Sequence, residues 1–242
     1  MTGLALTRSL REHPWRWTAV LLLVPLAAFP QIDISVSALF FSPVRQIFPF
    51  RIHPVGEFVR KQMPIGLFAL AGAVAALWAG AELLRRPLLG VTRRIGAYLL
   101  LSLALGPGLL VNLVLKDQWG RPRPSTIAEF SGKLHYARPL WPSGQCDDNC
   151  SFPSGHAALA FWLVAFAFLA PPRHRPLAVA AALLFGALVG LVRIAQGGHF
   201  LSDVAFSGVL TVGLTWWLYC RLVTPRRTPS PKNVDGETAE SR

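Results

Sequence analysis

The sequence has few charged residues. Asp, Glu, Lys and Arg make up only 15% of its 242 residues, whereas 52% are hydrophobic. A water-soluble domain normally carries about 25% charged residues, so the composition argues against a soluble protein, and the mean hydropathy of +0.43 agrees. Acidic residues are the scarcest of the charged types, with 12 against 24 basic residues and a net charge of +12.

Cysteine is also rare, with three residues in the chain. Cys146 and Cys150 are separated by three residues in one polar stretch, whereas Cys220 stands alone at the end of an apolar stretch. In an oxidising compartment the first two would form a disulfide; two unpaired thiols are the alternative. No matching pair of Cys or His accompanies them, so we expect no zinc site and no metal.

Long uncharged stretches separate the charges and approach the roughly 20 residues that a membrane-spanning helix needs. Six windows qualify: 17–32, 62–81, 95–115, 149–172, 176–192 and 204–220. The sequence therefore predicts an all-α polytopic membrane protein, a bundle of six transmembrane helices. The first window is short and contains two prolines, and a signal peptide is its alternative interpretation. The remaining five spans would then put the two termini on opposite sides, against the charge pattern.

The basic residues predict the orientation of the bundle. With the N-terminus in the cytoplasm, the short inner segments carry arginines densely, as the positive-inside rule expects, and both termini are cytoplasmic. We expect a single membrane-embedded domain over 1–223 and a disordered cytoplasmic tail over 224–242, which is polar and rich in Pro, Ser and Thr. The net positive charge then reflects orientation, and nucleic acid is not an expected partner.

Ionisable residues gather at the four helix ends that this topology places on the outer face. The third span ends at Lys116 and the fourth begins near His156. The fifth ends near Arg193, and the sixth begins after His199 and Asp203. Charged groups at membrane depth are costly and usually mark function. We therefore expect the active part of the protein to lie within 116–203.

The first of these clusters is the stretch KDQWGRPRP, residues 116–124. Lys116, Arg121 and Arg123 supply three cations, and the arginine fork suits phosphate oxygens while lysine acts as a point charge. The alternative is a basic flank whose side chains extend to the interface.

The second cluster is PSGH, residues 153–156. Ser154 can cap a helix that starts near Gly155, whose unpaired N–H groups favour an anion. A plain cap explains Ser154 and Gly155, but it does not explain His156 at the rim of an apolar helix.

The third cluster is RIAQGGHFLSD, residues 193–203. His199 and Asp203 are four residues apart, so on a helix they would share one face. An aspartate beside an imidazole fixes its tautomer and stabilises the imidazolium that forms during reaction. The alternative is a helix-start pair in which Asp203 interacts with the helix dipole.

The assembled residues are phosphate-binding cations, helix N–H donors, two histidines and one aspartate. The sequence lacks a Walker loop and a cluster of carboxylates for magnesium, and it lacks the second carboxylate of a glycosidase. It also lacks the usual context of a Ser-His-Asp triad. What remains is an inventory for metal-independent phosphoryl transfer through a covalent histidine, without a cofactor.

The three clusters resemble the signature of the type-II phosphatidic acid phosphatase superfamily, which includes the vanadium haloperoxidases. Lys116 through Arg123-Pro124 matches its first part and Pro153 through His156 its second. Arg193, His199 and Asp203 match the third part, in which Val192 replaces a serine. The resemblance spans about residues 95–220.

The resemblance implies a membrane phosphatase in which His199 attacks phosphorus, Asp203 orients His199, and His156 protonates the leaving oxygen. The residues implied to hold the phosphoryl oxygens are Lys116, Arg123, Ser154, Gly155 and Arg193, with Arg121 as an additional candidate outside the signature. Haloperoxidase activity is not expected, because those enzymes are typically soluble.

The substrate implied is a lipid phosphate or pyrophosphate. The 146–150 loop and GGHFLSD look most like bacterial lipid A phosphatases, while undecaprenyl pyrophosphate and phosphatidylglycerol phosphate remain open. The implied location is the bacterial inner membrane with the site on its outer face. Its partners would be membrane lipids, with no obligate protein partner. The outer segment 31–63 is either a partly interfacial substrate entrance or a plain loop with buried aromatics. Competing hypotheses are a lipid phosphotransferase and a non-catalytic lipid transporter or binder.

Overall fold

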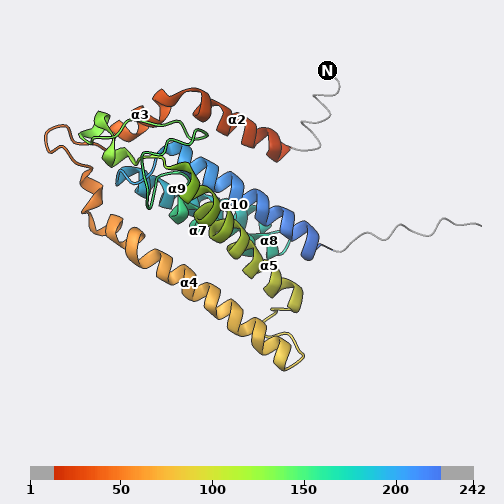
Figure 1. Ribbon diagram of the computed structural model, residues 1–242. Helices are drawn as coiled ribbons and strands as arrows, with labels where there is room; N and C mark the ends of the chain where they lie inside the picture. The colour runs from red at the N-terminus through yellow and green to blue at the C-terminus, as the bar shows by residue number, and fades with distance from the viewer. Residues whose placement is uncertain (1–13, 225–242) are drawn as a thin grey trace, which may run out of the picture.

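The computed structural model describes residues 14–224 as a bundle of helices, and no β-strand forms within that part of the chain (Figure 1). The expected tail lies almost wholly outside the described residues. The helices are α2 (Pro14–Ala28), α3 (Pro30–Ala38), α4 (Pro54–Leu83), α5 (Arg93–Leu103), the π-helical η2 (Ala104–Leu115), α6 (Lys116–Trp119), α7 (Gly155–Phe161), α8 (Val164–Leu169), α9 (Arg175–Ala195) and α10 (Leu201–Leu222), with short 3-10 turns η1 (Pro49–Arg51), η3 (Pro124–Thr126) and η4 (Ala128–Phe130).

Four helical stretches of the described chain are long and apolar enough to cross a membrane: α4, α5 continued by η2, α9 and α10. The pair α2 and α3 makes a fifth if it counts as one bent span. The expectation of an all-helical membrane protein is therefore confirmed. The predicted span 149–172 is helical only over Gly155–Leu169, because its first residues belong to a polar loop.

The first predicted span, 17–32, is not one straight helix. Trp17–Ala28 and Pro30–Ala38 are bent by 83° relative to each other. Pro30 has no N–H to continue the hydrogen bonds of α2, yet it suits the first turn of a new helix. The bend turns α3 inward, and it buries Asp33 and Ser37 completely.

The outer segment 31–63 differs from the expectation of a loop. Its first part is α3, and α4 already begins at Pro54. Between them, Phe41 and Phe48 pack against Phe130 with ring centroids 5.2–5.3 Å apart, and Phe48 is only 3% exposed. The aromatic residues thus partly form a small core, whereas Phe58 remains 59% exposed.

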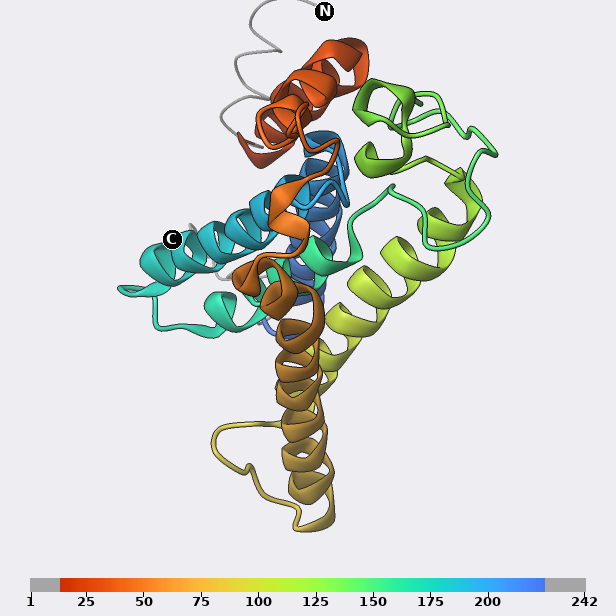
Figure 2. The ribbon, with the colours of Figure 1, turned by 90° about the vertical axis from the view of Figure 1, so that its left-hand side faces the viewer.

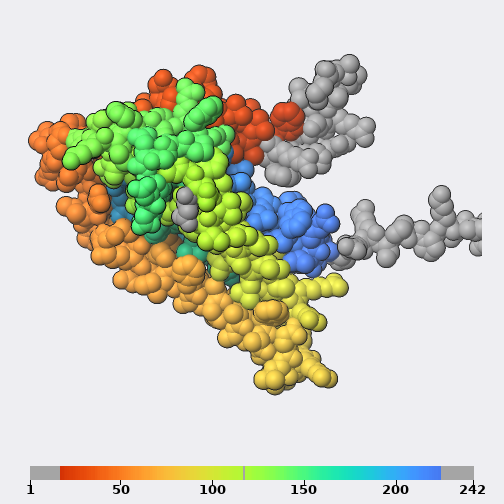
Figure 3. Space-filling view, viewed as in Figure 1, coloured from red at the N-terminus to blue at the C-terminus, as the bar shows by residue number. Residues whose placement is uncertain are grey.

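The helices converge so that the long connecting segments gather at one end. Segments 39–53 and 116–153 cover this end in Figure 3, and the turn 196–200 lies beneath them in Figure 1. Figure 2 shows the C-terminal end of α4 extending beyond the other helices toward the opposite end. The candidate site residues lie at the covered end.

The main core joins α4, α5, α8, α9 and α10, together with the break between α7 and α8. Trp162, at the break between α7 and α8, is fully buried, and its Nε1 donates to the Leu99 carbonyl at 3.1 Å and to the Ser102 hydroxyl at 3.0 Å. Tyr98 donates to the carbonyl of Ala165 at 3.1 Å. Satisfied polar groups of this kind fix how neighbouring helices pack, so α5 holds α7, whose first residues belong to the site.

Candidate active site

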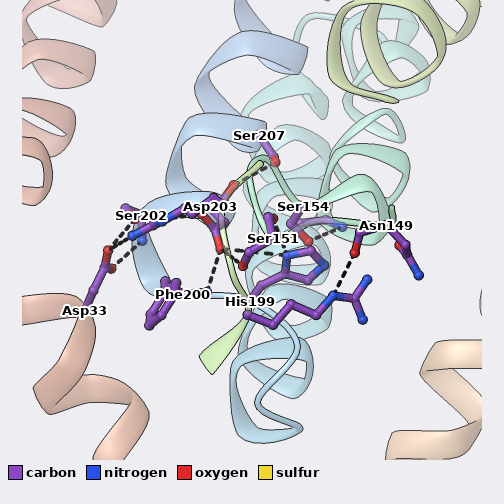
Figure 4. Close-up of polar contacts among 12 residues, drawn as sticks. Asp33, Asn149, Ser151, Ser154, His199, Phe200, Ser202, Asp203 and Ser207 are labelled. Carbon is purple, nitrogen blue, oxygen red and sulfur yellow. Dashed lines mark hydrogen bonds and ion pairs between the residues drawn. The ribbon is translucent and has the colours of Figure 1, made fainter. Parts of the chain in front are cut away.

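The carboxylate of Asp203 is buried at the centre of the site (Figure 4). Its Oδ2 accepts hydrogen bonds from the Ser151 hydroxyl at 2.5 Å and from the Phe200 backbone N–H at 2.7 Å. Its Oδ1 pairs with the guanidinium of Arg121. Because Asp203 is the third residue of α10, its bond to Phe200 also caps the start of that helix.

His199 lies just before α10 and is 1% exposed. Its Nδ1 is 2.7 Å from the Ser151 backbone oxygen and 3.8 Å from Oδ2 of Asp203. A carbonyl oxygen can only accept, so Nδ1 carries the ring proton and Nε2 holds the free lone pair. The expected shared helical face with Asp203 is therefore wrong, since His199 precedes the helix and the carbonyl of Ser151 orients its ring.

The imidazole of His199 is neutral at neutral pH. Burial lowers the pKa of His199 to about 3, and the neighbouring carboxylate of Asp203, 3.8 Å away, only partly opposes this shift. Burial disfavours the charged form of histidine because the interior solvates it poorly. A neutral imidazole with Nδ1 protonated presents Nε2 as a nitrogen nucleophile.

Ser154 caps α7, as the sequence predicts. Its Oγ accepts the Ala157 N–H at 3.4 Å, and its own N–H donates to the Asp203 backbone oxygen at 3.3 Å. Gly155 follows at the first position of α7, where an added Cβ would collide with Oδ1 of Asn112 on η2. The start of α7 is thus packed against both α10 and η2, and a side chain at position 155 would force Asn112 or the start of α7 to move.

We expect Gly155→Ala to lower kcat/KM by roughly 10- to 100-fold, because the Cβ must displace Asn112 or the start of α7 and small displacements at a reacting site are costly. Gly66→Ala is the control, since a Cβ on Gly66 of α4 would meet nothing within 4 Å. The measurement is release of inorganic phosphate by the purified variants from a lipid phosphate, the substrate that the sequence resemblance implies. Equal kcat/KM for both variants would contradict the tight packing described for Gly155.

A cavity of about 830 Å³ opens beside the turn that carries His199, and its lining includes Gly198. Arg123 and Arg193, which are far apart in the sequence, both line this cavity, together with Arg51 and Arg60. The Nε atom of Arg193 is buried without a hydrogen-bond partner among residues 14–224. Unpaired buried donors are costly, and an anion in the cavity would satisfy them.

Two of these arginines are fixed by neighbouring groups. Arg193 donates to the Gln196 side-chain oxygen, and Nε of Arg123 donates to the Asn149 carbonyl at 2.9 Å (Figure 4). Burial, and then the positive charge of Arg51, lower the pKa of Arg123. Crowded cations with fixed orientation suit a multiply charged anion such as a phosphoryl group.

His156 faces a second cavity, of about 530 Å³, which it lines with Lys116 and Gly155. The Nε2 atom of His156 lies 3.1 Å from the backbone oxygen of Arg60. Pro64, four residues after Arg60, has no N–H to donate to that oxygen within α4. His156 therefore takes up a carbonyl that the proline leaves free. Arg60 also connects the two cavities, since its side chain lines the first.

Arg121 does not lie at either cavity, and this corrects its assignment as an additional phosphate-binding residue. It is 0% exposed, and all its N–H groups are engaged. Nε donates to the Ala137 carbonyl at 2.8 Å, Nη1 contacts Ser202 and Asp203, and Nη2 contacts Asp33 and Tyr136. No N–H remains for a phosphoryl oxygen, so Arg121 joins parts of the protein.

A disulfide joins Cys146 and Cys150. It closes a short loop that contains Asn149, which contacts Arg123, and that directly precedes Ser151, which contacts His199 and Asp203. The bond therefore constrains the segment that orients the histidine. In the described part of the chain, His, Cys, Asp and Glu side chains form no group of three that could hold a metal ion.

The structure thus brings Arg123 and Arg193 to one cavity, and Lys116, Gly155 and His156 to a neighbouring one, with His199, Asp203 and Ser154 packed at the turn of α10. Sequence reasoning missed Ser151, Asn112 and Asp33. Ser151 lies two residues before the PSGH cluster, but it orients His199 through its backbone oxygen, which the residue type does not reveal. Nothing in the local sequence marks Asp33, because its partners lie far along the chain.

The chain matches the PAP2 superfamily model over residues 95–227. It is 46% identical over 123 residues to a lipid A 4'-phosphatase of Francisella tularensis subsp. novicida, covering 50% of this chain and 55% of that protein, so the match spans about half of that relative's length. It is 35% identical over 206 residues to a lipid A 4'-phosphatase of Rhizobium leguminosarum, covering 78% of this chain and 86% of that protein. A phosphatidylglycerophosphatase B of Bacillus subtilis is 32% identical over 118 residues, 48% of this chain and 52% of that protein. No solved structure matches the chain.

These matches define the class of protein. The chain belongs to the PAP2 superfamily, and it is a phosphatase of that family with membrane-spanning helices. The resemblance drawn from the three sequence clusters is confirmed at the level of the family.

Proposed function

We propose that the protein is an integral membrane phosphatase that removes a phosphate group from a lipid, with a lipid A phosphate as the favoured substrate. One observation carries the proposal: His199 is buried with Nδ1 held by the Ser151 carbonyl, beside a cavity lined by Arg123 and Arg193. The names of the relatives from Francisella and Rhizobium support lipid A as substrate.

In the proposed first step, Nε2 of His199 attacks phosphorus and forms a P–N bond while the P–O bond to the lipid breaks. Asp203 and the Ser151 carbonyl stabilise the positive charge that develops on the imidazole. Arg123 and Arg193 stabilise the charge on the phosphoryl oxygens in the transition state.

The leaving lipid oxygen takes the electron pair of the broken bond and a proton from His156. Nε2 of His156 is engaged with the Arg60 carbonyl, so in the protonated form Nδ1–H is the donor left for the leaving oxygen. Lys116 lines the same cavity as His156 and favours a negatively charged group there.

In the second step, water attacks phosphorus, the P–N bond breaks, and its electron pair returns to Nε2 of His199. Inorganic phosphate leaves, and His156, now neutral, accepts the proton of the attacking water. The two steps together consume one water and restore both histidines.

The proposal includes six spans with both termini in the cytoplasm and the site on the outer face of the bacterial inner membrane. The bent pair α2 and α3 counts as the first span, and Gly155–Leu169 as the fourth. Two features support it: the site segments gather at one end of the bundle (Figure 1), and the arginine-rich segments 85–94 and 173–175 lie between spans away from it.

The test is phosphate release by the purified protein in detergent or vesicles, with a chelator present, on lipid A, undecaprenyl pyrophosphate, phosphatidylglycerol phosphate and phosphatidic acid. We expect chelator-resistant release of inorganic phosphate, fastest from lipid A. Mass spectrometry of the lipids then distinguishes the alternative, because only a phosphotransferase yields a newly phosphorylated acceptor lipid. A protein that binds these lipids without releasing phosphate would overturn the proposal.

A further inference from the structure

A second buried carboxylate, Asp33, lies close to the site although it belongs to α3, outside the residues that match the family model. Its side chain is 0% exposed. A carboxylate is buried at considerable cost unless its oxygens are fully engaged. Asp33 meets that condition. Its four hydrogen-bond partners, which are donor groups of three residues, show what it holds in place.

Two of those partners are at the start of α10. Oδ1 of Asp33 accepts the backbone N–H of Ser202 at 2.8 Å, and Oδ2 accepts the Ser202 hydroxyl at 2.5 Å. Ser202 is the second residue of α10, where backbone N–H groups have no partner within the helix. Asp33 therefore caps α10 from another helix and places a negative charge at its N-terminus, which the helix dipole favours.

The other two partners are Arg121 and Tyr136. Nη2 of Arg121 lies 2.8 Å from Oδ2 of Asp33, and the Tyr136 hydroxyl donates to the same oxygen at 3.0 Å. Through its other terminal nitrogen, Arg121 pairs with Asp203. One buried guanidinium thus bridges the two carboxylates. Figure 4 shows the arrangement of Asp33, Ser202 and Asp203.

The consequence concerns the geometry of His199. The turn that carries His199 leads directly into α10, and Asp203 lies one residue after Ser202. If the first turn of α10 shifts, or if Arg121 is drawn wholly to Asp203, both the position of the imidazole and the charge beside it change.

We propose that Asp33 is a positioning residue of the phosphoryl-transfer site: from the bent N-terminal helix it caps α10 and holds Arg121 between the two carboxylates, so that Asp203 and His199 are correctly placed. This inference rests on the proposed function only for its activity readout. It extends the functional unit to a helix that lies outside the family's matched segment.

The variant Asp33→Asn tests the proposal. The two oxygens of Asp33 face two fixed donors, the Ser202 N–H and Nη2 of Arg121. An asparagine offers one oxygen, so its amide NH₂ faces one of these donors in either orientation. We expect kcat to fall roughly 10- to 100-fold with KM within about threefold of wild type, because the substrate cavity is untouched and the reacting groups are displaced.

Ser37→Ala is the matched control. Ser37 lies one turn further along α3, is equally buried, and its hydroxyl has no hydrogen-bond partner among the described residues. If Asp33→Asn lowered activity only because a changed buried polar group in α3 weakens the fold, Ser37→Ala would lower activity as well. We expect Ser37→Ala to keep wild-type kcat.

A second readout does not depend on activity. Amide hydrogen exchange at residues 200–204 reports the cap directly, and we expect roughly five- to tenfold faster exchange in Asp33→Asn than in Ser37→Ala, as for the loss of a helix cap. If the wild type releases no phosphate, the proposed function fails, and the exchange measurement still decides the role of Asp33.

Tyr136→Phe and Ser202→Ala keep the test valid if Asp33→Asn does not fold. Each removes one hydroxyl that donates to Asp33, and Tyr136 and Ser202 also contact Arg121. We expect a loss of kcat of a few fold in each, with unchanged KM. Wild-type kcat in Asp33→Asn, or in both milder variants, together with unchanged exchange at 200–204, would overturn the proposal.

Discussion

Replacing His199 with asparagine is expected to lower kcat by roughly 10⁴-fold or more, as for the loss of a covalent nucleophile in other enzymes. Nδ2 of an asparagine can stand where Nδ1 of His199 stands and donate to the Ser151 carbonyl, so the buried oxygen keeps its partner. The side chain then lacks any counterpart of Nε2. The variant removes the proposed nucleophile and leaves the local hydrogen bond.

The binding part of the site should survive this change. Arg123 and Arg193 are held by Asn149 and Gln196, not by His199. We therefore expect KM within about threefold of wild type, because interactions made equally in ground and transition states are retained. The measurement is steady-state phosphate release together with thermal unfolding in detergent.

His174→Ala is the control for this experiment, because His174 is exposed in the turn before α9, away from the site. It should retain full activity. If His199→Asn kept turnover within about tenfold of wild type, His199 would not be the nucleophile and the covalent mechanism would be wrong.

Replacing Arg121 with methionine is expected to destabilise the protein by about 3–5 kcal/mol, the usual cost of breaking a buried ion pair by removing one partner. The substitution leaves Asp33 and Asp203 buried without the cation between them. It also removes the donor that satisfies the Ala137 carbonyl. Loss of activity should follow from loss of folding, visible as a lower midpoint of thermal unfolding.

Arg123→Met is the matched control, two residues away and at the cavity. Among residues 14–224, the guanidinium of Arg123 makes one hydrogen bond, to the Asn149 carbonyl. We expect its fold to be retained and its kcat/KM to fall roughly 10²- to 10³-fold, as when a group that stabilises transition-state charge is removed. If Arg121→Met instead unfolded at the wild-type temperature and lost only activity, the guanidinium of Arg121 would act on substrate and would not be a structural link between Asp33 and Asp203.

The contrast between Arg121 and Arg123 illustrates how far the sequence predicts the site. Both arginines lie in the same GRPRP stretch and offer the same chemistry. Only tertiary structure distinguishes them, since Arg121 finds Asp33 and Asp203, which are 88 and 82 residues away. The three clusters, their order and their convergence at one end of a helical bundle could be predicted from hydropathy and motif spacing, because both are local properties.

Asp33 and Ser151 could not be predicted in the same way. Asp33 follows an apolar window and resembles an ordinary boundary of a span, and its bond to Ser202 joins residues 169 apart. Ser151 contributes to the orientation of His199 through its backbone oxygen, which is independent of residue type. The predicted span 149–172 is longer than the helical stretch Gly155–Leu169, because hydropathy does not distinguish uncharged loop residues from helical ones.

In the proposed mechanism, phosphoryl transfer passes through His199 in two in-line steps. The stereochemistry at phosphorus tests it most directly, with a lipid phosphate made chiral with sulfur and oxygen isotopes and hydrolysed in isotopically labelled water. Each in-line displacement inverts phosphorus, so two displacements through His199 give net retention in the released thiophosphate. Net inversion would show a single direct attack by water and would contradict the covalent role of His199.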